Sequence, residues 1–295
     1  MRRAVDWVDA FTAQPFGGNG CAVVHDAADL DSDTCCAFVR ETSLVECTFV
    51  GPLSDASADV KVRYFLASHE IPFAGHPTVA TAASLWDRGI LTTSPMRFET
   101  GAGIITVDVR ETETGPVFTM TQAAPQFGAS ADPAAVAEIY GLSASDIVGT
   151  PQVVSTGLGF TITVLSSRDA LERAVMDHDL LHAHCAELGV PDGTMLEPYL
   201  ITLNGATDAG DTFGRLLMLP PSPAEDPFTG SATGAAAAYL WKHGLIDRPT
   251  YVAEQGHGMG RPGQAQVEIV GAKGAPELIR VGGQGHILMS GELRL

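Results

Sequence analysis

Two nine-residue stretches that share one pattern decide the fold: Glu70-Ile-Pro-Phe-Ala-Gly-His-Pro-Thr78 and Glu225-Asp-Pro-Phe-Thr-Gly-Ser-Ala-Thr233. They lie 155 residues apart, and at this offset the proline, the phenylalanine, the glycine and the last threonine coincide. The match continues without a gap through an alanine-rich run that ends in Leu-Trp and a glycine, Gly89 in one copy and Gly244 in the other. Such a dense match indicates an internal duplication, so we expect two halves with the same fold.

Each copy has the pattern of a loop that leads into a helix. Pro72 and Pro227 disfavour helix just before the loop, and the alanine-rich runs 79–85 and 234–240 are strong helix formers. Gly89 and Gly244 are candidates for the C-terminal caps of these helices. Because bulky side chains are rare in both runs, we expect each helix to be packed closely inside its half.

Short apolar and alternating runs around these helices are typical of strands, namely 21–24, 61–66, 104–110, 161–165, 215–219 and 267–270. Two more helices are predicted at 133–140 and 178–188. The expected fold class is α+β, with two similar lobes related by a pseudo-twofold axis, each a mixed β-barrel or curved sheet around a central helix. We expect an N-terminal lobe at 1–125, completed by the final strand at 284–295, and a C-terminal lobe at 126–283.

Composition narrows the class of protein. Of the 295 residues, 45% are hydrophobic and the formal net charge is −18, which predicts a globular protein that binds neither nucleic acid nor an anionic membrane. No apolar run reaches the roughly 18 residues of a membrane span, and no secretory signal is present. Five cysteines without a Cys-x-x-Cys motif favour buried thiols in a reducing compartment, so a cytoplasmic location is expected.

The duplicated loops predict a binding site for an anion. The first amide N–H groups of a helix have no partner within the helix, and together with the helix dipole they attract negative charge. If the halves pack about a pseudo-twofold axis, both helix starts face one cleft, where Gly75, Gly230 and Ser231 would hold a substrate carboxylate. The alternative is that the two glycines only form turns.

The two copies differ where chemistry would take place. His76 stands opposite Ser231, and Asp226 stands opposite Ile71. An acid–base pair placed asymmetrically in a symmetric cleft is what proton transfer requires. The alternatives are a histidine bonded to backbone at the helix start and an aspartate that serves a loop or an N-cap.

Glu46 is the third candidate. It lies in Ser43-Leu-Val-Glu-Cys-Thr-Phe-Val50, between apolar residues of a predicted strand. Partial desolvation there would raise the pKa of the carboxyl and make it a usable acid and base near neutrality. The alternative is a strand residue that faces solvent.

Several further motifs occur in a recognisable order. They are Asp9-Ala-Phe-Thr12, Phe16-Gly-Gly-Asn-Gly-Cys-Ala-Val23, Glu46-Cys-Thr-Phe-Val50, the two repeated loops, Gln255-Gly256 and Met259-Gly-Arg-Pro-Gly263. Over nearly the whole chain these segments resemble the phenazine biosynthesis-like (PhzF-like) family. The Glu-Asp-Pro-Phe-Thr-Gly-Ser segment is the most specific of them.

This resemblance implies the fold of diaminopimelate epimerase and an isomerase that needs no metal or organic cofactor. It implies that Glu46 moves the proton, that His76 and Asp226 are its polar partners, and that Gly75, Gly230 and Ser231 bind a small carboxylate substrate. It also implies a homodimer and a role in secondary metabolism, with dihydro-3-hydroxyanthranilate isomerisation as the type reaction. Gly20 and Val45 depart from the family pattern and leave the substrate open.

Competing interpretations receive less support. An epimerase with two thiol bases is excluded because Ala74 and Thr229 occupy the cysteine positions; an amino-acid epimerase or racemase would need two other bases on opposite faces of the substrate. A non-catalytic ligand-binding protein would not need Glu46, His76 and Asp226. A metal site among His178, His182 and His184 has no carboxylate clearly placed as a third ligand. The Gly-x-Gly-x-x-Gly pattern of a dinucleotide site is absent from the sequence.

Overall fold

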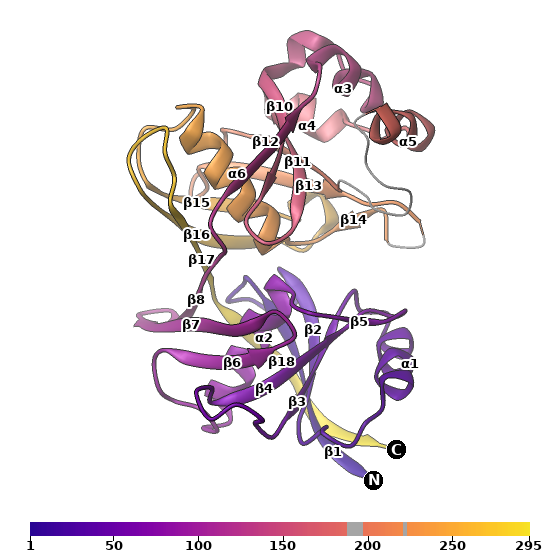
Figure 1. Ribbon diagram of the computed structural model, residues 1–295, viewed down its shortest axis with the longest axis vertical. Coiled ribbons are helices and arrows are strands. Elements are labelled where there is room, and N and C mark those ends of the chain that lie inside the picture. The colour runs from indigo at the N-terminus through magenta and orange to yellow at the C-terminus, as the bar shows by residue number, and fades with distance from the viewer. Residues whose placement is uncertain (188–196, 221–222) are drawn as a thin grey trace. The chain divides into compact units, whose positions relative to one another are not determined.

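The chain folds into two compact units. The computed structural model describes residues 1–187, 197–220 and 223–295. The first unit contains Met1–Thr121 together with Gly282–Leu295, and the second contains Gln122–Val281. Figure 1 shows the path of the chain through each unit.

In the first unit a curved sheet surrounds one helix. Its elements are β1 (Arg2–Ala10), β2 (Asn19–Val24), α1 (Ser32–Thr42), β3 (Cys47–Gly51), β4 (Val60–Phe65), β5 (Glu70–Ile71), α2 (Gly75–Asp87), β6 (Met96–Thr100), β7 (Gly103–Thr112), β8 (Gly115–Thr121) and β18 (Gly285–Arg294). The strands β18, β1, β2, β3, β4, β6, β7 and β8 are hydrogen-bonded in this order. Only β2–β3 and β4–β6 are parallel, and β5 adds to β4 as a short antiparallel partner.

The second unit repeats this plan. Its elements are β9 (Gln126–Ser130), α3 (Pro133–Ile139), η1 (Ala144–Asp146), β10 (Ile147–Ser155), β11 (Gly159–Leu165), α4 (Arg168–Arg173), α5 (His178–Glu187), β12 (Glu197–Thr202), β13 (Thr212–Leu217), β14 (Glu225–Asp226), α6 (Gly230–Lys242), β15 (Thr250–Gln255), η2 (His257–Met259) and β16 (Gly263–Val270). The strand β17 (Leu278–Gly283) leads from this unit into the first. The strands β9, β10, β11, β12, β13, β15 and β16 pair in this order, with β11–β12 and β13–β15 parallel.

The two pairing patterns coincide strand by strand. Five consecutive pairs, β1–β2 to β6–β7 in the first unit and β10–β11 to β15–β16 in the second, are in turn antiparallel, parallel, antiparallel, parallel and antiparallel. In each unit a two-residue strand just before the central helix pairs antiparallel with the strand that precedes it, β5 with β4 and β14 with β13. Equivalent ion pairs also occur, Arg63 with Glu70 at 2.7 Å and Arg215 with Glu225 at 3.0 Å. The predicted duplication and the predicted α+β class are therefore confirmed.

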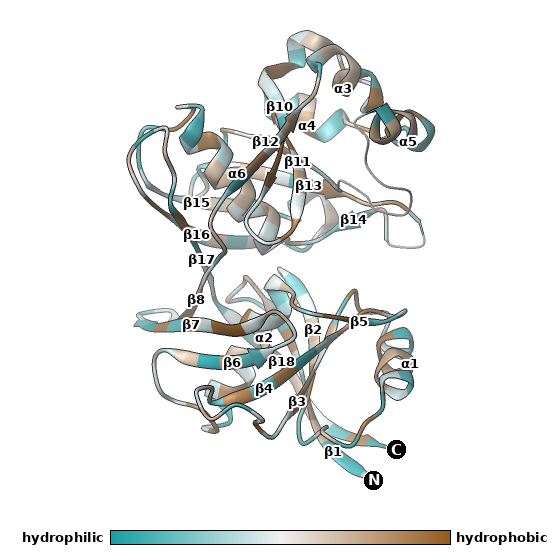
Figure 2. Cartoon of the chain, viewed as in Figure 1, coloured by the Kyte–Doolittle hydropathy of each residue, from teal (hydrophilic) through white to brown (hydrophobic). Residues whose placement is uncertain are grey.

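The central helices α2 and α6 are almost entirely buried. Every residue from Gly75 to Leu85 is buried, and so are the alanines of α6. Figure 2 shows pale and brown tones along most of α6, with no continuous hydrophilic face. Both helices end alike: Gly89 and Gly244 have a φ of 65°, and the next residue donates its N–H to the carbonyl of Leu85 or Leu240. These are Schellman caps, as the two glycines predicted.

Other elements differ from the sequence prediction. Neither α1 nor α4 was predicted. Their N-cap residues are Asp31 and Ser167, whose side chains accept a hydrogen bond from a backbone N–H in the first turn of the helix. The predicted strand at 215–219 is β13 at Thr212–Leu217, which begins three residues earlier and ends two residues earlier than predicted. α5 follows the predicted helix at 178–188, whose last residue lies outside the described residues.

Two apolar clusters lie outside the central helices. In the first unit, α1 packs its Cys35, Cys36 and Val39 against Phe49 and Phe65 of the sheet. In the second, α3, α4 and α5 cover β12 and β13 in the same manner. Among the described residues, no helix is both long and apolar enough to cross a membrane.

Candidate functional site

The start of α2 presents His76 from a well-buried position. The N-cap residue is Ala74, so no side chain caps the first turn of the helix. Pro77 is compatible with this first turn because it needs no hydrogen-bond partner there. The side chain of His76 is only 5% exposed. Its ring is therefore held by protein contacts rather than by water.

Glu46 and Asn19 both approach the same ring nitrogen of His76. Glu46 Oε2 lies 3.5 Å from His76 Nδ1, and Asn19 Nδ2 lies 3.1 Å from the same atom. Glu46 was predicted within a strand, but it stands one residue before β3, where the chain enters the sheet after a bend. Its side chain is 16% exposed, so the interpretation of a solvent-facing strand residue is wrong. Glu46 and His76 form a partly desolvated carboxylate–imidazole pair.

Two thiols next to Glu46 are chemically quiet. Burial raises the pKa of Cys21 well above its usual value, and it raises the pKa of Cys47 to about 11. Both groups stay protonated near neutral pH, because a thiol in an apolar surrounding loses the solvation of its charged form. The two thiols are thus excluded as proton acceptors, which leaves Glu46 and His76 as the acid–base groups of this cluster.

In the second unit, Asp226 stands at the end of the short strand β14, three residues before the N-cap of α6. Asp226 is 5% exposed. The hydroxyl of the N-cap residue Thr229 donates a hydrogen bond to Asp226 Oδ2 rather than capping the helix. Gly230 and Ser231 are the first two residues of α6, and Gln122 Nε2 donates to the Gly230 carbonyl at 2.9 Å. Asp226 thus lies beside an uncapped helix start.

The structure places the six predicted residues in two groups. Glu46, His76 and Gly75 gather at the start of α2, and Asp226, Gly230 and Ser231 gather at the start of α6. That these groups form one site stays a prediction.

Three residues that contact the predicted ones were not among the predicted site residues. Asn19 was noticed only within the Gly-Asn turn, Thr229 only as the residue at a cysteine position, and Gln255 only within the Gln-Gly motif. Gln255 is fully buried and bonds both to Thr229 and to the backbone of Asp226. The motifs that contain these three residues were the signal by which the sequence could have identified them. Their contacts with the predicted residues arise only in the folded chain.

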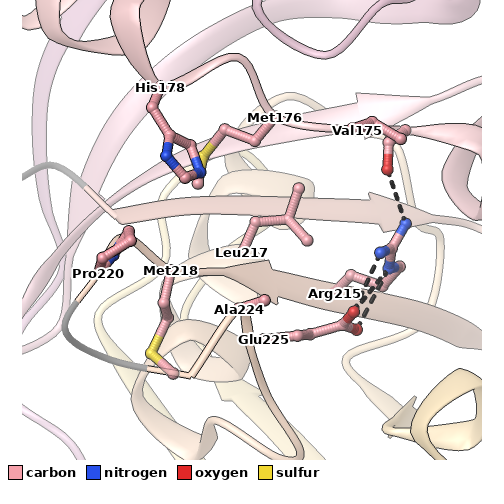
Figure 3. Close-up of a pocket in the computed structure, with 10 residues that line it drawn as sticks. Val175, Met176, His178, Arg215, Leu217, Met218, Pro220, Ala224 and Glu225 are labelled. Atoms are coloured by element: carbon pink, nitrogen blue, oxygen red, sulfur yellow. Dashed lines mark hydrogen bonds and ion pairs between the residues drawn. The ribbon is translucent and has the colours of Figure 1, made fainter.

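A separate pocket of about 390 Å³ opens in the second unit (Figure 3). Its wall is largely apolar and includes Met176, Leu217 and Met218, with His178 at one side. Its charged residues, Arg215 and Glu225, are paired with each other. None of the predicted site residues lines it. In the part of the chain that the structure describes, no three His, Cys, Asp or Glu side chains are grouped as metal ligands would be.

Comparison with known proteins places this arrangement in context. Residues 8–291 match the model of a family described as phenazine biosynthesis-like protein. An uncharacterized isomerase YfhB of Bacillus subtilis is 30% identical over 90% of both chains. A trans-2,3-dihydro-3-hydroxyanthranilate isomerase of Pseudomonas aeruginosa is 30% identical over 98% of both.

Solved structures agree. A PhzF-family phenazine biosynthesis protein of Bacillus anthracis superposes with a TM-score of 0.88 at 26% identity, over the full length of both chains. A hydroxyproline epimerase of Agrobacterium vitis shares the fold, with a TM-score of 0.63 at 13% identity over 100% of this chain and 93% of that one.

Proposed function

Because the chain belongs to the phenazine biosynthesis-like (PhzF-like) family of isomerases, we propose that it moves a proton between two carbon atoms of a small carboxylate substrate, with Glu46 as the acid–base group. The observation that carries this proposal is the contact of 3.5 Å between Glu46 Oε2 and His76 Nδ1 in a largely buried setting. A carboxylate that is partly removed from water is a stronger base than one on the surface.

The proposed reaction is balanced within the substrate and Glu46. The carboxylate of Glu46 takes a proton from one substrate carbon, and the electron pair left behind shifts along the adjacent unsaturated bonds. The same proton then returns to a second carbon, which regenerates the carboxylate. One residue therefore serves first as base and then as acid, and no external oxidant, reductant or second substrate is consumed.

The two helix starts are the proposed anchors for the substrate carboxylate. Neither Ala74 nor Thr229 caps its helix with a side chain, so the N–H groups near Gly75, Gly230 and Ser231 keep the favourable field of an open helix start. In the proposal, His76 and Asp226 bind the polar groups of the substrate and orient it toward Glu46.

The support for a substrate class is the P. aeruginosa relative, which is named for trans-2,3-dihydro-3-hydroxyanthranilate. We propose a related unsaturated carboxylate from secondary metabolism, a homodimeric enzyme, a cytoplasmic location and activity without metal or organic cofactor. Gly20 lies in a crowded place, since a Cβ there would lie 3.1 Å from Leu44 Cδ2 and 3.3 Å from Trp7 Nε1. The side chains of Leu44 and Trp7 therefore leave little space at this position for the proline of the family pattern.

The decisive experiment compares Glu46→Gln with wild type in D2O, with trans-2,3-dihydro-3-hydroxyanthranilate as the probe and NMR to follow proton transfer and deuterium uptake. Glutamine keeps the shape of the side chain but cannot exchange a proton. We expect turnover to fall by about 10²–10⁴-fold while the thermal midpoint and the binding of the probe are retained.

Glu41→Gln on the exposed face of α1 is the matched control and should behave as wild type. A Glu46→Gln enzyme within a few-fold of wild type would overturn the assignment and direct attention to Asp226. EDTA treatment and size-exclusion chromatography of the same samples test the proposals of cofactor-free activity and of a homodimer.

A further inference from the structure

We infer that Thr229 is a positioning residue that fixes and stabilises the Asp226 carboxylate, and that Gln255 imposes this role on it. The inference deepens the proposed function, on which the catalytic importance of Asp226 rests. It is carried by a set of hydrogen bonds within the second unit that are independent of any substrate.

The orientation of the Gln255 amide is determined by its two backbone partners. Its Nε2 lies 2.8 Å from the Asp226 carbonyl oxygen, which can only accept a hydrogen bond. Its Oε1 lies 3.1 Å from the Thr229 backbone nitrogen, which can only donate. A flipped amide would set two acceptors against each other and two donors against each other. The nitrogen and oxygen of this buried side chain are therefore assigned without ambiguity.

This orientation determines the direction of the Thr229 hydroxyl. Gln255 Nε2 also lies 3.2 Å from Thr229 Oγ1, so the hydroxyl oxygen accepts a hydrogen bond there. Its own proton is left for Asp226 Oδ2, the other partner. The hydroxyl of Tyr199 supports the start of the chain by donating to Gln255 Oε1 at 3.3 Å. Burial raises the pKa of Tyr199 to about 12, so this donor keeps its proton at neutral pH.

The backbone around Gln255 is built for this contact. Gly256 has a φ of 83°, and a Cβ at this position would lie 2.5 Å from the Pro227 carbonyl oxygen. Only glycine lets the end of β15 approach the loop that carries Asp226 so closely. The Gln-Gly pair thus acts as a unit in which one residue bonds and the other gives access.

The other copy of the repeat lacks all three members of the network. At the offset of 155 residues, Asp226, Thr229 and Gln255 correspond to Ile71, Ala74 and Thr100. Thr100 is used elsewhere, since its hydroxyl donates to the Gly103 carbonyl. A network needed only to hold a helix start would serve both α2 and α6. Its restriction to the copy with the carboxylate points to the carboxylate as its purpose.

The chemical consequence concerns both groups. The Thr229 proton is committed to Asp226, so Thr229 does not act as a base even though it occupies the position of an epimerase cysteine. A hydrogen bond to an ionised carboxylate favours the charged form. The hydrogen bond from Thr229 therefore orients the Asp226 carboxylate and acts in favour of its charged form.

The test is an NMR titration of the free protein labelled with ¹³C at the aspartate side-chain carboxyls, with the Asp226 signal assigned by its loss in Asp226→Asn. Thr229→Val removes the hydroxyl at constant shape, and Thr229→Ser is the conservative variant that keeps it. We expect Thr229→Val to raise the midpoint of the Asp226 titration by about one pH unit or more. Thr229→Ser should titrate within a few tenths of wild type.

An unchanged midpoint in Thr229→Val overturns the inference. If Thr229→Val does not fold, the unaltered protein decides: exchange of H2O for D2O must shift the Asp226 carboxyl signal through the bound hydroxyl, and the absence of this isotope shift counts equally against the inference. Turnover of trans-2,3-dihydro-3-hydroxyanthranilate is measured in parallel. An inactive wild type would contradict the proposed function, while the titration would still test the network.

Discussion

Asn19 shows how a single side chain sets the chemistry of a neighbour. Asn19 Nδ2, which can only donate, lies 3.1 Å from His76 Nδ1 and favours the neutral ring that carries its proton on Nε2, whereas the Glu46 carboxylate 3.5 Å from the same nitrogen favours a proton on Nδ1. The contact is buried on both sides, since Asn19 and His76 are each almost inaccessible to solvent. Asn19 thus acts against Glu46 in setting which nitrogen of His76 carries the ring proton.

Replacement of Asn19 by alanine should lower kcat/KM about tenfold, because the ring loses the donor that fixes its orientation and tautomer. Asn19→Asp should lower it further, since a carboxylate attracts the ring proton back to Nδ1. Steady-state kinetics with the probe substrate measure the effect, and ¹⁵N NMR of the imidazole reports the tautomer. Asn204→Ala, which removes a long contact to Thr202 in the second unit, is the control. A ring that stays protonated on Nε2 in Asn19→Asp would contradict this role.

A second buried network predicts acid sensitivity of the first unit. Burial raises the pKa of Asp6, but hydrogen bonds from Arg88, Ser84, Ser290 and His25 outweigh it and hold the pKa well below its usual range. Burial lowers the pKa of His25, and its contact with Asp6 offsets only part of this.

Both shifts have the same sign of effect on stability. A group whose pKa is depressed on folding contributes stability at high pH and loses it on acidification. The loss should begin below the ordinary histidine pKa of 6.5 and continue below the ordinary aspartate pKa of 3.8.

Urea unfolding at pH 8, 6, 4 and 2 measures this loss. Asp6→Asn should lower the free energy of unfolding at neutral pH by about 3–5 kcal/mol, because Arg88 and His25 lose their buried partner. It should also flatten the pH dependence below about pH 4, where the wild-type protein loses the contribution of ionised Asp6. Asp29→Asn, at an exposed ion pair with Arg3, is the control and should change little. Parallel pH profiles for wild type and Asp6→Asn would refute the prediction.

Candidate site residues could be named from the sequence, but their contacts could not. Glu46, His76 and Asp226 were found because they break the repeat or match a family motif. The contact between Asn19 and His76 joins residues 57 positions apart, and no local pattern records such a distance. The network of Gln255, Thr229 and Asp226 was missed for the same reason, although each residue lies in a motif.

At the scale of elements, α6 depends on one glycine in its buried face. A Cβ on Gly234 would lie 1.8 Å from Gln122 Oε1. That amide donates to the Gly230 carbonyl and accepts from Thr156 at 2.5 Å, so it ties the helix start to β10 and the loop before β9. The other copy has Val79 at this position.

Gly234→Ala should therefore destabilise the protein by about 1–3 kcal/mol through overpacking, although alanine is the better helix former. Differential scanning calorimetry should show a lower Tm. Gly258→Ala is the matched control, because a Cβ at Gly258 meets nothing within 4 Å. A Gly234→Ala protein as stable as wild type would show that Gln122 has room to move.

The helices that were missed lie where the chain crosses between parallel strands. A parallel pair requires a crossover connection, and α1 and α4 lie in the crossovers from β2 to β3 and from β11 to β12. The sequence alone does not reveal which strands pair in parallel, so the crossover helices α1 and α4 could not be predicted from it. The central helices were predictable since their duplicated loops, alanines and terminal glycines all lie within one local stretch.

At the scale of the whole molecule, the last strand of the sequence completes the first unit. β18 pairs antiparallel with β1 along nearly its whole length, from Arg2 opposite Arg294 to Ala10 opposite Gly285. Without β18, one edge of β1 would expose its backbone hydrogen-bonding groups. Asp6 would also lose the hydrogen bond from Ser290.

Truncation after Gln284 should therefore destabilise the first unit and cause concentration-dependent aggregation, while the second unit stays folded. Light scattering and hydrogen exchange of the separate units measure both effects. Removal of Leu295 alone, which bonds only at the margin to Met1, is the control. A monomeric truncated protein with normal exchange protection in β1 would contradict this expectation.

The pairing of β1 with β18 also determines the order in which a growing chain can fold. The second unit, Gln122–Val281, is contiguous, so all of its residues are synthesised before β18 is made. The first unit emerges earlier from the ribosome but must wait for residues 285–294. At about 5–20 residues per second, β1 waits on the order of tens of seconds for its partner. Biosynthesis thus reverses the usual sequence of events: the unit made first is finished last, and during that interval the edge of β1 is without the partner that β18 provides.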